Sequence, residues 1–235
     1  AQAIEIVVGQ GAKPGTGGML MGVKVLDEIS EMRDLPSGID QRSPARHPDW
    51  LGPDDLAIKI EQLREATNWS VPIQIKLGAC RVADDVKLAA KAGADSIVVD
   101  GMVAGTGASA EVLLDHSGIP TVPSIVMARE ALREIGLYRK VSLIASGGIR
   151  SGADVAKALA LGADAVAIGI AALIALNCNR EIPESNFEEE IGVAAGQCHH
   201  CHTGKCPVGI ATQDHELVKR LDADEGAERV ANFIN

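Results

Sequence analysis

Apolar and amphipathic stretches alternate along most of this chain. Short runs rich in Val, Ile, Leu and Ala recur at 4–8, 71–77, 96–99, 141–145 and 165–168. Around them, apolar residues return at helical spacing over 54–67, 82–92, 126–136, 152–161 and 170–177. Runs such as SIVVD and AVAIG are typical of strands buried on both faces. Strands that alternate with helices predict βαβ units, a parallel sheet and an α/β fold.

Other stretches give weaker signals. A further short strand is expected at 120–124, and a single charged helix is expected over 214–233. The stretch 19–53 contains four prolines and is expected to be irregular. Residues 179–197 carry an acidic run and indicate a surface excursion.

Composition narrows the class of protein. The chain has 235 residues, of which 46% are hydrophobic, so it can bury a sizeable core as one domain. The net charge of −10 argues against nucleic-acid and anionic-membrane partners. No apolar run reaches about 18 residues, and no signal peptide is visible. Five cysteines in such a chain suggest ligands rather than disulfides, and hence a reducing, cytoplasmic location.

Glycines follow two of the predicted strands. Ser146, Gly147 and Gly148 come after one strand, and Gly169 comes after the next. Glycines in such loops let backbone N–H groups approach a phosphate, and barrels commonly bind phosphate at the loops after their last strands. The alternative is that these are ordinary glycines of strand–helix turns.

Two further features could contact a flat, anionic cofactor. Lys76 lies at the carboxyl end of a predicted strand, where its charge could stabilise a reduced flavin or a substrate, unless it simply extends to solvent. The loop 101–109 is rich in small residues, among them Gly105, Thr106 and Gly107, and could lie against a ring.

Gln10, Lys13 and Arg33 form a candidate anion site. Arg binds a carboxylate in a bidentate way and Lys binds it as a point charge, so the three residues suit a dicarboxylate. The alternative is that the cations form surface ion pairs.

The cysteine pattern is the densest chemical signal. Cys198, Cys201 and Cys206 follow one another closely, Pro207 follows the last of them, and Cys178 stands twenty residues ahead. Thiolates gathered in this way indicate a metal centre, either iron–sulfur or structural zinc with help from His199, His200 or His202. Cys80 is more typical of a loop or buried thiol.

Taken together, these motifs resemble the synthase domain of the glutamate synthase family. The segments that carry the resemblance are QGAKPGTGG at 10–18, SPARHP at 43–48, GTGAS at 105–109, the glycine-rich stretch at 146–169, AALIALNC at 171–178 and CHTGKCPVGIATQD at 201–214. The resemblance implies the carboxyl-terminal portion of a (β/α)8 TIM barrel with a cysteine-rich, cluster-binding extension. The implied regions are a partial FMN-binding barrel over 1–177, an iron–sulfur segment over 178–213 and a final helix over 214–235.

The same resemblance implies roles for individual residues. Lys76, Gly147, Gly148 and Gly169 would contact FMN, with the 105–109 loop nearby. Gln10, Lys13 and Arg33 would hold 2-oxoglutarate over the flavin. Cys178, Cys201 and Cys206 would bind a 3Fe–4S cluster, and Cys198 as a fourth ligand would make it 4Fe–4S. The implied reaction is the reduction of 2-iminoglutarate to L-glutamate.

The resemblance also sets expectations about partners. The family's barrel begins before residue 1, so roughly its first three strands are expected on a preceding segment or another chain. Ammonia would come from a glutaminase (amidotransferase) subunit, and electrons from a donor subunit or ferredoxin, in a hetero-oligomer.

Three alternatives fit parts of the sequence. The segment 46–55 resembles the related subunit of N-methylglutamate synthase, which uses methylamine in place of ammonia. The chain could instead be an inactive or zinc-bound scaffold. A barrel of the IMP dehydrogenase type shares the phosphate glycines, but the dicarboxylate loop and the cysteines argue against it.

Overall fold

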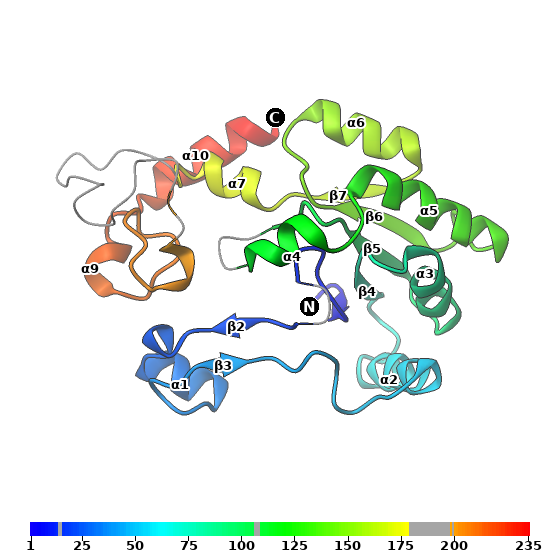
Figure 1. Ribbon diagram of the computed structural model, residues 1–235, viewed down its shortest axis with the longest axis horizontal. Coiled ribbons are helices and arrows are strands. Elements are labelled where there is room, and N and C mark those ends of the chain that lie inside the picture. Colours follow the sequence, from blue (N-terminus) through cyan, green and yellow to red (C-terminus); the bar gives the residue numbers. More distant parts are fainter. Residues whose placement is uncertain (14–15, 106–108, 179–197, 199) are drawn as a thin grey trace. The chain divides into compact units, whose positions relative to one another are not determined.

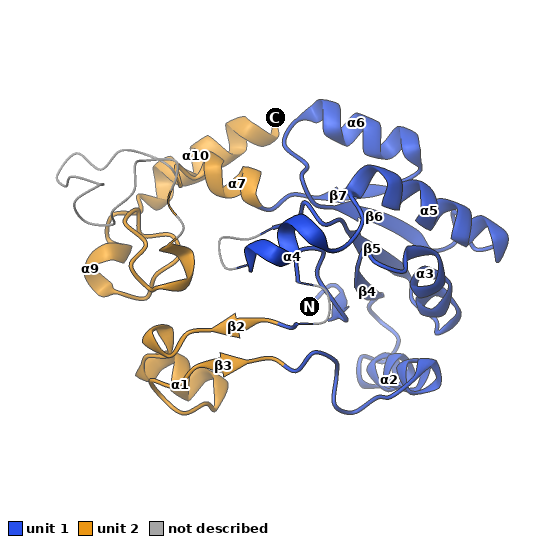
Figure 2. Cartoon of the chain, viewed as in Figure 1, with its two compact units in different colours: residues 1–17, 44–169 blue, residues 18–43, 170–235 orange. Residues whose placement is uncertain are grey.

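The computed structural model describes residues 1–13, 16–105, 109–178, 198 and 200–235 (Figure 1). The chain divides into two compact units, coloured separately in Figure 2. The first unit comprises 1–17 and 44–169, and the second comprises 18–43 and 170–235. The functional division predicted from the sequence, at 177 and 213, stays a prediction.

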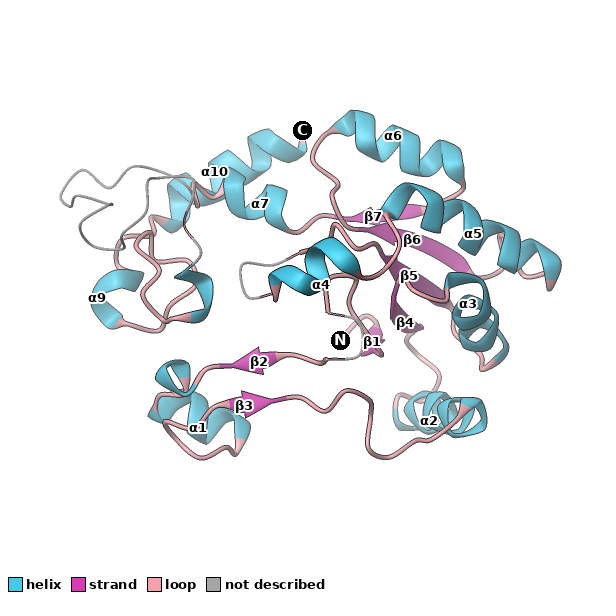
Figure 3. Ribbon diagram, in the orientation of Figure 1, coloured by secondary structure: helices cyan, strands magenta, loops and turns pink. Residues whose placement is uncertain are grey.

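A five-stranded parallel sheet forms the centre of the first unit (Figure 3). Its strands, in spatial order, are β1 (Ile4–Val7), β4 (Ile73–Gly78), β5 (Ser96–Asp100), β6 (Ser142–Ser146) and β7 (Ala165–Ala167). Spatial order follows chain order, which is common where consecutive βαβ units place sequential strands side by side. The predicted α/β fold with a parallel sheet is therefore confirmed. Closure of this sheet into a barrel stays a prediction.

Helices connect the strands and cover one face of the sheet. They are α2 (Pro53–Ala66), α3 (Val82–Lys91), α5 (Thr121–Glu134) and α6 (Gly152–Leu161), with a shorter helix, α4 (Glu111–His116), before α5. In β4, Ile73, Ile75 and Leu77 are buried among these helices. Since side chains alternate along a strand, Gln74 and Lys76 lie on the opposite face.

The carboxyl ends of the strands place four residues in one row. In the register of the sheet, Asp100 lies beside Gly78 on one side and Ser146 on the other, and Ser146 lies beside Ala167. Ligands of open parallel sheets bind at this edge. The row therefore marks where a functional site is expected.

Two aspartates fix the opposite edge of the sheet. Asp95 accepts a hydrogen bond from the N–H of Ile73 (2.7 Å) and pairs with Arg64. Asp164, just before β7, makes the equivalent contact with β6. It accepts a hydrogen bond from the N–H of Leu143 (2.9 Å). Each carboxylate satisfies an amide where a strand begins, which pins the register of its neighbour.

The strand expected at 120–124 is wrong. Residues from Thr121 onward form the first turn of α5, for which Pro120 is the N-terminal cap residue. Pro123 lies in that first turn, where the missing N–H needs no partner, so the proline starts the helix instead of opposing it.

The second unit contains short elements. They are β2 (Met19–Leu20), the 3-10 turn η1 (Gly22–Lys24), α1 (Asp27–Arg33), β3 (Gln41–Arg42), α7 (Ile170–Ala175), the 3-10 turn η2 (His200–His202), α9 (His215–Val218) and α10 (Ala223–Ile234). The segment expected to be irregular therefore contains a helix and an antiparallel strand pair. The surface excursion expected at 179–197 lies outside the described residues.

The helix expected over 214–233 is two helices. Asp214 caps α9 by accepting from the N–H groups of Glu216 and Leu217, and Asp222 caps α10 in the same way. A second N-terminal cap inside the predicted span starts a new helix there. None of the described helices is long and apolar enough to cross a membrane.

Candidate functional site

Asp100 lies at the centre of the carboxyl edge of the sheet. Its side chain is only 3% exposed, and Oδ2 lies 3.6 Å from Nζ of Lys76. The same oxygen accepts a hydrogen bond from the N–H of Gly11 at 3.0 Å. Asp100 therefore connects strand β4 to the loop that follows β1, although the sequence had given it no role.

The loop that carries Gln10 and Lys13 is held against this edge. The N–H groups of Val8 and Gly9 both donate to the carbonyl of Lys76, at 3.0 and 3.3 Å. Within the loop, the N–H of Lys13 donates to the carbonyl of Gln10 at 3.1 Å. The structure thus brings the predicted residues Gln10, Lys13 and Lys76 to one end of the sheet.

Gly11 is required at its position by close packing. A Cβ atom on Gly11 would lie 1.9 Å from the carbonyl oxygen of Gly101 and 2.5 Å from that of Asp100. Only glycine lets the loop backbone approach the end of β5 closely enough for the bond to Asp100.

The glycines after β6 form a fixed turn. Gly147 and Gly148 have φ angles of 106° and 71°, which favour glycine. The hydroxyl of Thr121, at the start of α5, donates to the carbonyl of Gly147 at 2.8 Å and anchors the turn from the next helix. In the described structure the N–H groups of Gly147, Gly148 and Gly169 donate to no other residue. Free amides on glycine turns fit a phosphate group.

The structure describes only some of the other residues that the sequence predicted for the cofactor and substrate sites. Gly105 packs against the side chain of Leu114 of α4, and a Cβ there would lie 2.6 Å from a terminal methyl of that leucine, which would have to shift. Thr106 and Gly107 lie outside the described residues. Arg33 ends α1 with an exposed side chain and belongs to the second unit, whereas Gln10 and Lys13 belong to the first. A shared dicarboxylate site for the three stays a prediction.

The four cysteines predicted as ligands are all in the second unit. Burial raises the pKa of Cys178, and the neighbouring sulfurs of Cys201, Cys206 and Cys198 raise it further. Burial raises the pKa of Cys201 as well, again followed by the effects of Cys206 and Cys198. The sulfurs of Cys198 and Cys206 therefore lie close enough to Cys178 and Cys201 to affect the pKa values of those two thiols. Cys80 lies in the first unit as an exposed loop thiol.

Lys24 joins the cysteine group from a distant part of the sequence. Its Nζ donates to the carbonyl of Cys201 at 3.0 Å, and its charge partly offsets the rise in the pKa of that thiol. Cys206 is buried and packs with Val208 and Cys198. The segment is thus folded around its thiols, with a cation beside one of them.

The chemistry of the donor set fits a thiolate-bound metal centre. Thiols gathered in one segment could bind either an iron–sulfur cluster or a single zinc. Among the described residues, no three His, Cys, Asp or Glu side chains lie close enough together to hold one metal ion. The choice between iron–sulfur and zinc stays a prediction.

The raised thiol pKa values predict a pH dependence for the metal-free protein. Folding raises the pKa of Cys178 and Cys201 above the ordinary value of 9.0. The unfolded chain therefore loses these protons first, and stability present below about pH 9 is lost as pH rises through the folded-state values. Thermal melts of chelator-treated full-length protein between about pH 8 and pH 11 should show this decline. The decline should be smaller in Cys178→Ser, and an equal decline in that variant would show that other groups cause it.

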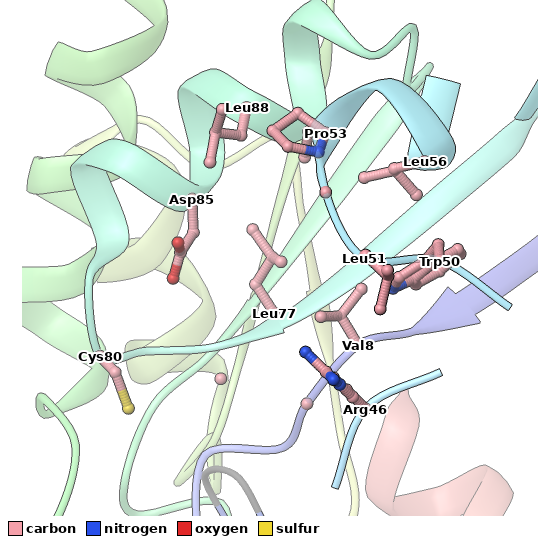
Figure 4. Close-up of a pocket in the computed structure, with 14 residues that line it drawn as sticks. Val8, Arg46, Trp50, Leu51, Pro53, Leu56, Leu77, Cys80, Asp85 and Leu88 are labelled. Carbon is pink, nitrogen blue, oxygen red and sulfur yellow. The ribbon is translucent and has the colours of Figure 1, made fainter. Parts of the chain in front are cut away.

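A separate cavity of about 450 Å³ lies near the carboxyl ends of β1 and β4 (Figure 4). The side chains that line it are mainly apolar and include Val8, Trp50, Leu56, Leu77 and Leu88, with Arg46, Cys80 and Asp85 as polar members. None of the predicted site residues is among the described residues that line it. It nevertheless adjoins the row at the carboxyl ends of the strands, because Gly78, the neighbour of Asp100 in the sheet, also lines it.

The fold and site define an α/β protein with a parallel sheet, a candidate ligand site at the carboxyl ends of its strands, and a cysteine-rich segment. The family model described as the conserved region in glutamate synthase matches residues 1–183 and 186–235. The chain belongs to the glutamate synthase family, as its motifs predicted.

Individual relatives agree with this placement. The chain is 56% identical over 234 residues to a glutamate synthase large subunit-like protein of Rhizobium meliloti, and covers 53% of that protein. It is 49% identical to the archaeal glutamate synthase (NADPH) of Methanocaldococcus jannaschii, covering 42% of it. It is 36% identical to the ferredoxin-dependent glutamate synthase of Cyanidium caldarium, covering 14% of it. The alignments include 100%, 99% and 100% of this chain.

The chain spans about half the length of the first of these relatives and less of the others. Among solved structures, a mutant of FabK from Thermotoga maritima is similar to 49% of this chain and 33% of its own, with 23% identity and a TM-score of 0.38. A likeness that low supports no conclusion about this chain.

Proposed function

We propose that this chain is the FMN- and iron–sulfur-binding portion of an enzyme that reduces 2-iminoglutarate, formed from 2-oxoglutarate and ammonia, to L-glutamate. The observation that carries the proposal is the carboxyl edge of the sheet. There the loop of Gln10 and Lys13 and the side chain of Lys76 meet at Asp100, within the same unit as the free amides of the glycine turns.

The residues present fit FMN. The amides of Gly147, Gly148 and Gly169 would hold the phosphate, and Ser146 begins the same turn. Lys76, whose side chain is 21% exposed, would place a positive charge beside the isoalloxazine ring. Bound FMN would supply the hydride for the imine carbon. The loop at 105–109 would lie near the ring.

Gln10, Lys13 and Arg33 would bind and orient the substrate. Lys13 and Arg33 would supply the positive charges that a dicarboxylate requires. The side-chain amide of Gln10 would donate a hydrogen bond to a carboxylate oxygen and adds no charge. Fixing both carboxylates orients the imine carbon toward the face from which reduction occurs.

Cys178, Cys201 and Cys206 would bind a 3Fe–4S cluster, with Cys198 as the fourth ligand of a 4Fe–4S cluster in the other version of the proposal. The effect of neighbouring cysteine sulfurs on the pKa values of Cys178 and Cys201 supports this set. The cluster would pass electrons toward the flavin. Lys24 would add a positive charge beside the Cys201 ligand.

The whole protein would need further parts. We propose that the parallel sheet closes into a (β/α)8 barrel with strands that lie outside this chain. Ammonia would come from a glutaminase subunit, and electrons from a pyridine-nucleotide-linked subunit or ferredoxin, in a cytoplasmic hetero-oligomer.

The direct test is an anaerobic assay of the full-length protein co-purified with its partners. Reduced enzyme would be mixed with 2-oxoglutarate and either ammonia or methylamine, and the products identified by mass spectrometry. Glutamate from ammonia supports the proposal. N-methylglutamate as the main product would change the assignment to N-methylglutamate synthase. If neither product forms, the chain would be a scaffold.

Replacing Arg33 by alanine should raise the KM for 2-oxoglutarate about tenfold to a hundredfold, because hydrogen bonds to charged groups contribute about 1.5–3 kcal/mol. The content of bound flavin should not change. Arg42→Ala is the matched control, since Arg42 is another exposed arginine of the same unit. Equal KM values in the two variants would remove Arg33 from the substrate site.

A further inference from the structure

We propose that Asp100 is a positioning residue that fixes Lys76 and the Gln10–Lys13 loop, and that its charge lowers the redox potential of the flavin. This inference rests on the proposed function, because it assumes that flavin binds beside Lys76. It adds a residue and a physical role that neither the motifs nor the glycine turns had indicated.

The positioning role follows from the contacts of one carboxylate oxygen. Oδ2 of Asp100 accepts from the N–H of Gly11 at 3.0 Å and lies 3.6 Å from Nζ of Lys76. Gly11 and Asp100 are 89 positions apart in the sequence, so this contact joins the loop after β1 to the end of β5. One buried group thus controls both the loop that would hold the substrate and the cation that would face the flavin.

The second carboxylate oxygen supports a functional origin. Oδ1 of Asp100 is buried and has no hydrogen-bond partner in the described structure. Leaving a buried carboxylate oxygen without a donor is unfavourable for folding, so the group needs an explanation, and a catalytic or redox role is one that accounts for it. Asparagine could occupy the same volume without the charge, so the carboxylate is not needed for packing.

The effect on potential follows from the charge of the pair. The lysine ammonium favours the anionic, reduced form of a nearby flavin. Asp100 partly cancels that charge from a site of low dielectric, where electrostatic effects are strong. Removing the carboxylate should therefore stabilise reduced flavin and raise the midpoint potential.

Two substitutions separate the two roles. Asp100→Asn keeps an oxygen that can accept from Gly11 but removes the charge, whereas Asp100→Ala removes both. We expect Asp100→Asn to favour reduced over oxidised flavin about tenfold, a rise of about 30 mV for a two-electron couple. Hydrogen exchange at the Gly11 amide should stay slow in Asp100→Asn and accelerate at least about tenfold in Asp100→Ala.

The measurements use the full-length flavoprotein, with potentials from anaerobic titration and exchange read on the peptide that contains residues 9–13. Asp85→Asn is the matched control, since Asp85 is a partly buried carboxylate of the same unit that lines the cavity of Figure 4. It should shift neither quantity.

The outcomes distinguish this inference from the proposed function. Flavin bound at an unchanged potential in Asp100→Asn would overturn the redox role alone. Unchanged exchange in Asp100→Ala would overturn the positioning role, which can be judged without flavin. A full-length protein that binds no flavin would overturn the proposed function and the redox role together.

Discussion

Cys206→Ser should abolish the iron–sulfur absorbance of the full-length protein and lower glutamate synthesis by at least about a hundredfold, beyond the 10–100-fold expected from a change in an outer-shell partner. Cys206 is buried among Val208 and Cys198, so its thiol has no solvent-facing alternative role. A serine hydroxyl is a hard, weakly acidic group and replaces a soft thiolate poorly as an iron ligand. Iron content, the visible spectrum and the rate with the physiological electron donor would be measured on the same preparation.

Cys80→Ser is the control for this substitution. Cys80 is an exposed loop thiol of the first unit and has no part in the proposed ligand set. It should retain both iron and activity. A Cys206→Ser protein with the iron content and rate of Cys80→Ser would contradict the cluster assignment, and Cys198→Ser would show whether a fourth thiolate is used.

Gly11→Ala should destabilise the protein by about 3 kcal/mol or more and reduce binding of 2-oxoglutarate. The added Cβ would lie 1.9 Å from the carbonyl oxygen of Gly101, so either the loop or the end of β5 must move. Overpacking of a rigid site costs about 1–3 kcal/mol, and here both neighbouring atoms belong to the backbone and cannot rotate away. The shift would also break the bond to Asp100. Chemical denaturation and the KM for 2-oxoglutarate measure the two effects.

Gly152→Ala is the comparison for Gly11→Ala. Gly152 is the first residue of α6, and a Cβ there would meet nothing within 4 Å. Alanine has the higher helix propensity, so this variant should be neutral or more stable by up to about 1 kcal/mol. If both glycine variants unfold at the same denaturant concentration, the close packing at Gly11 has no energetic consequence.

The sheet could be predicted from the sequence because its signal is local. The apolar runs of β4 to β7 and the helices between them repeat a pattern that each segment carries by itself. Two segments were predicted wrongly, and the reasons are also local. The run TVPSIV is rich in β-branched residues, yet its proline suits a first helical turn, and Asp222 ends one predicted helix by capping another.

The site was only partly predictable because its connecting residues act over long sequence separations. Lys76 and the glycines of 146–148 could be proposed from strand ends and resemblance. The bond from Lys24 to Cys201 spans 177 positions, and nothing in the pattern around Lys24 indicates it. Asp100 offered a clue, as a charged residue that ends an apolar run, but its partner Gly11 could be identified only in the folded structure.

The most direct test of the account is the visible spectrum of the full-length protein, purified anaerobically with its partners. We expect the two absorption bands of an oxidised flavin above a broad iron–sulfur shoulder that dithionite bleaches. The purified protein should release FMN when it is denatured, in an amount close to one molecule per chain. A colourless protein that carries zinc on its cysteines would contradict the account and leave the chain as a scaffold of the glutamate synthase family.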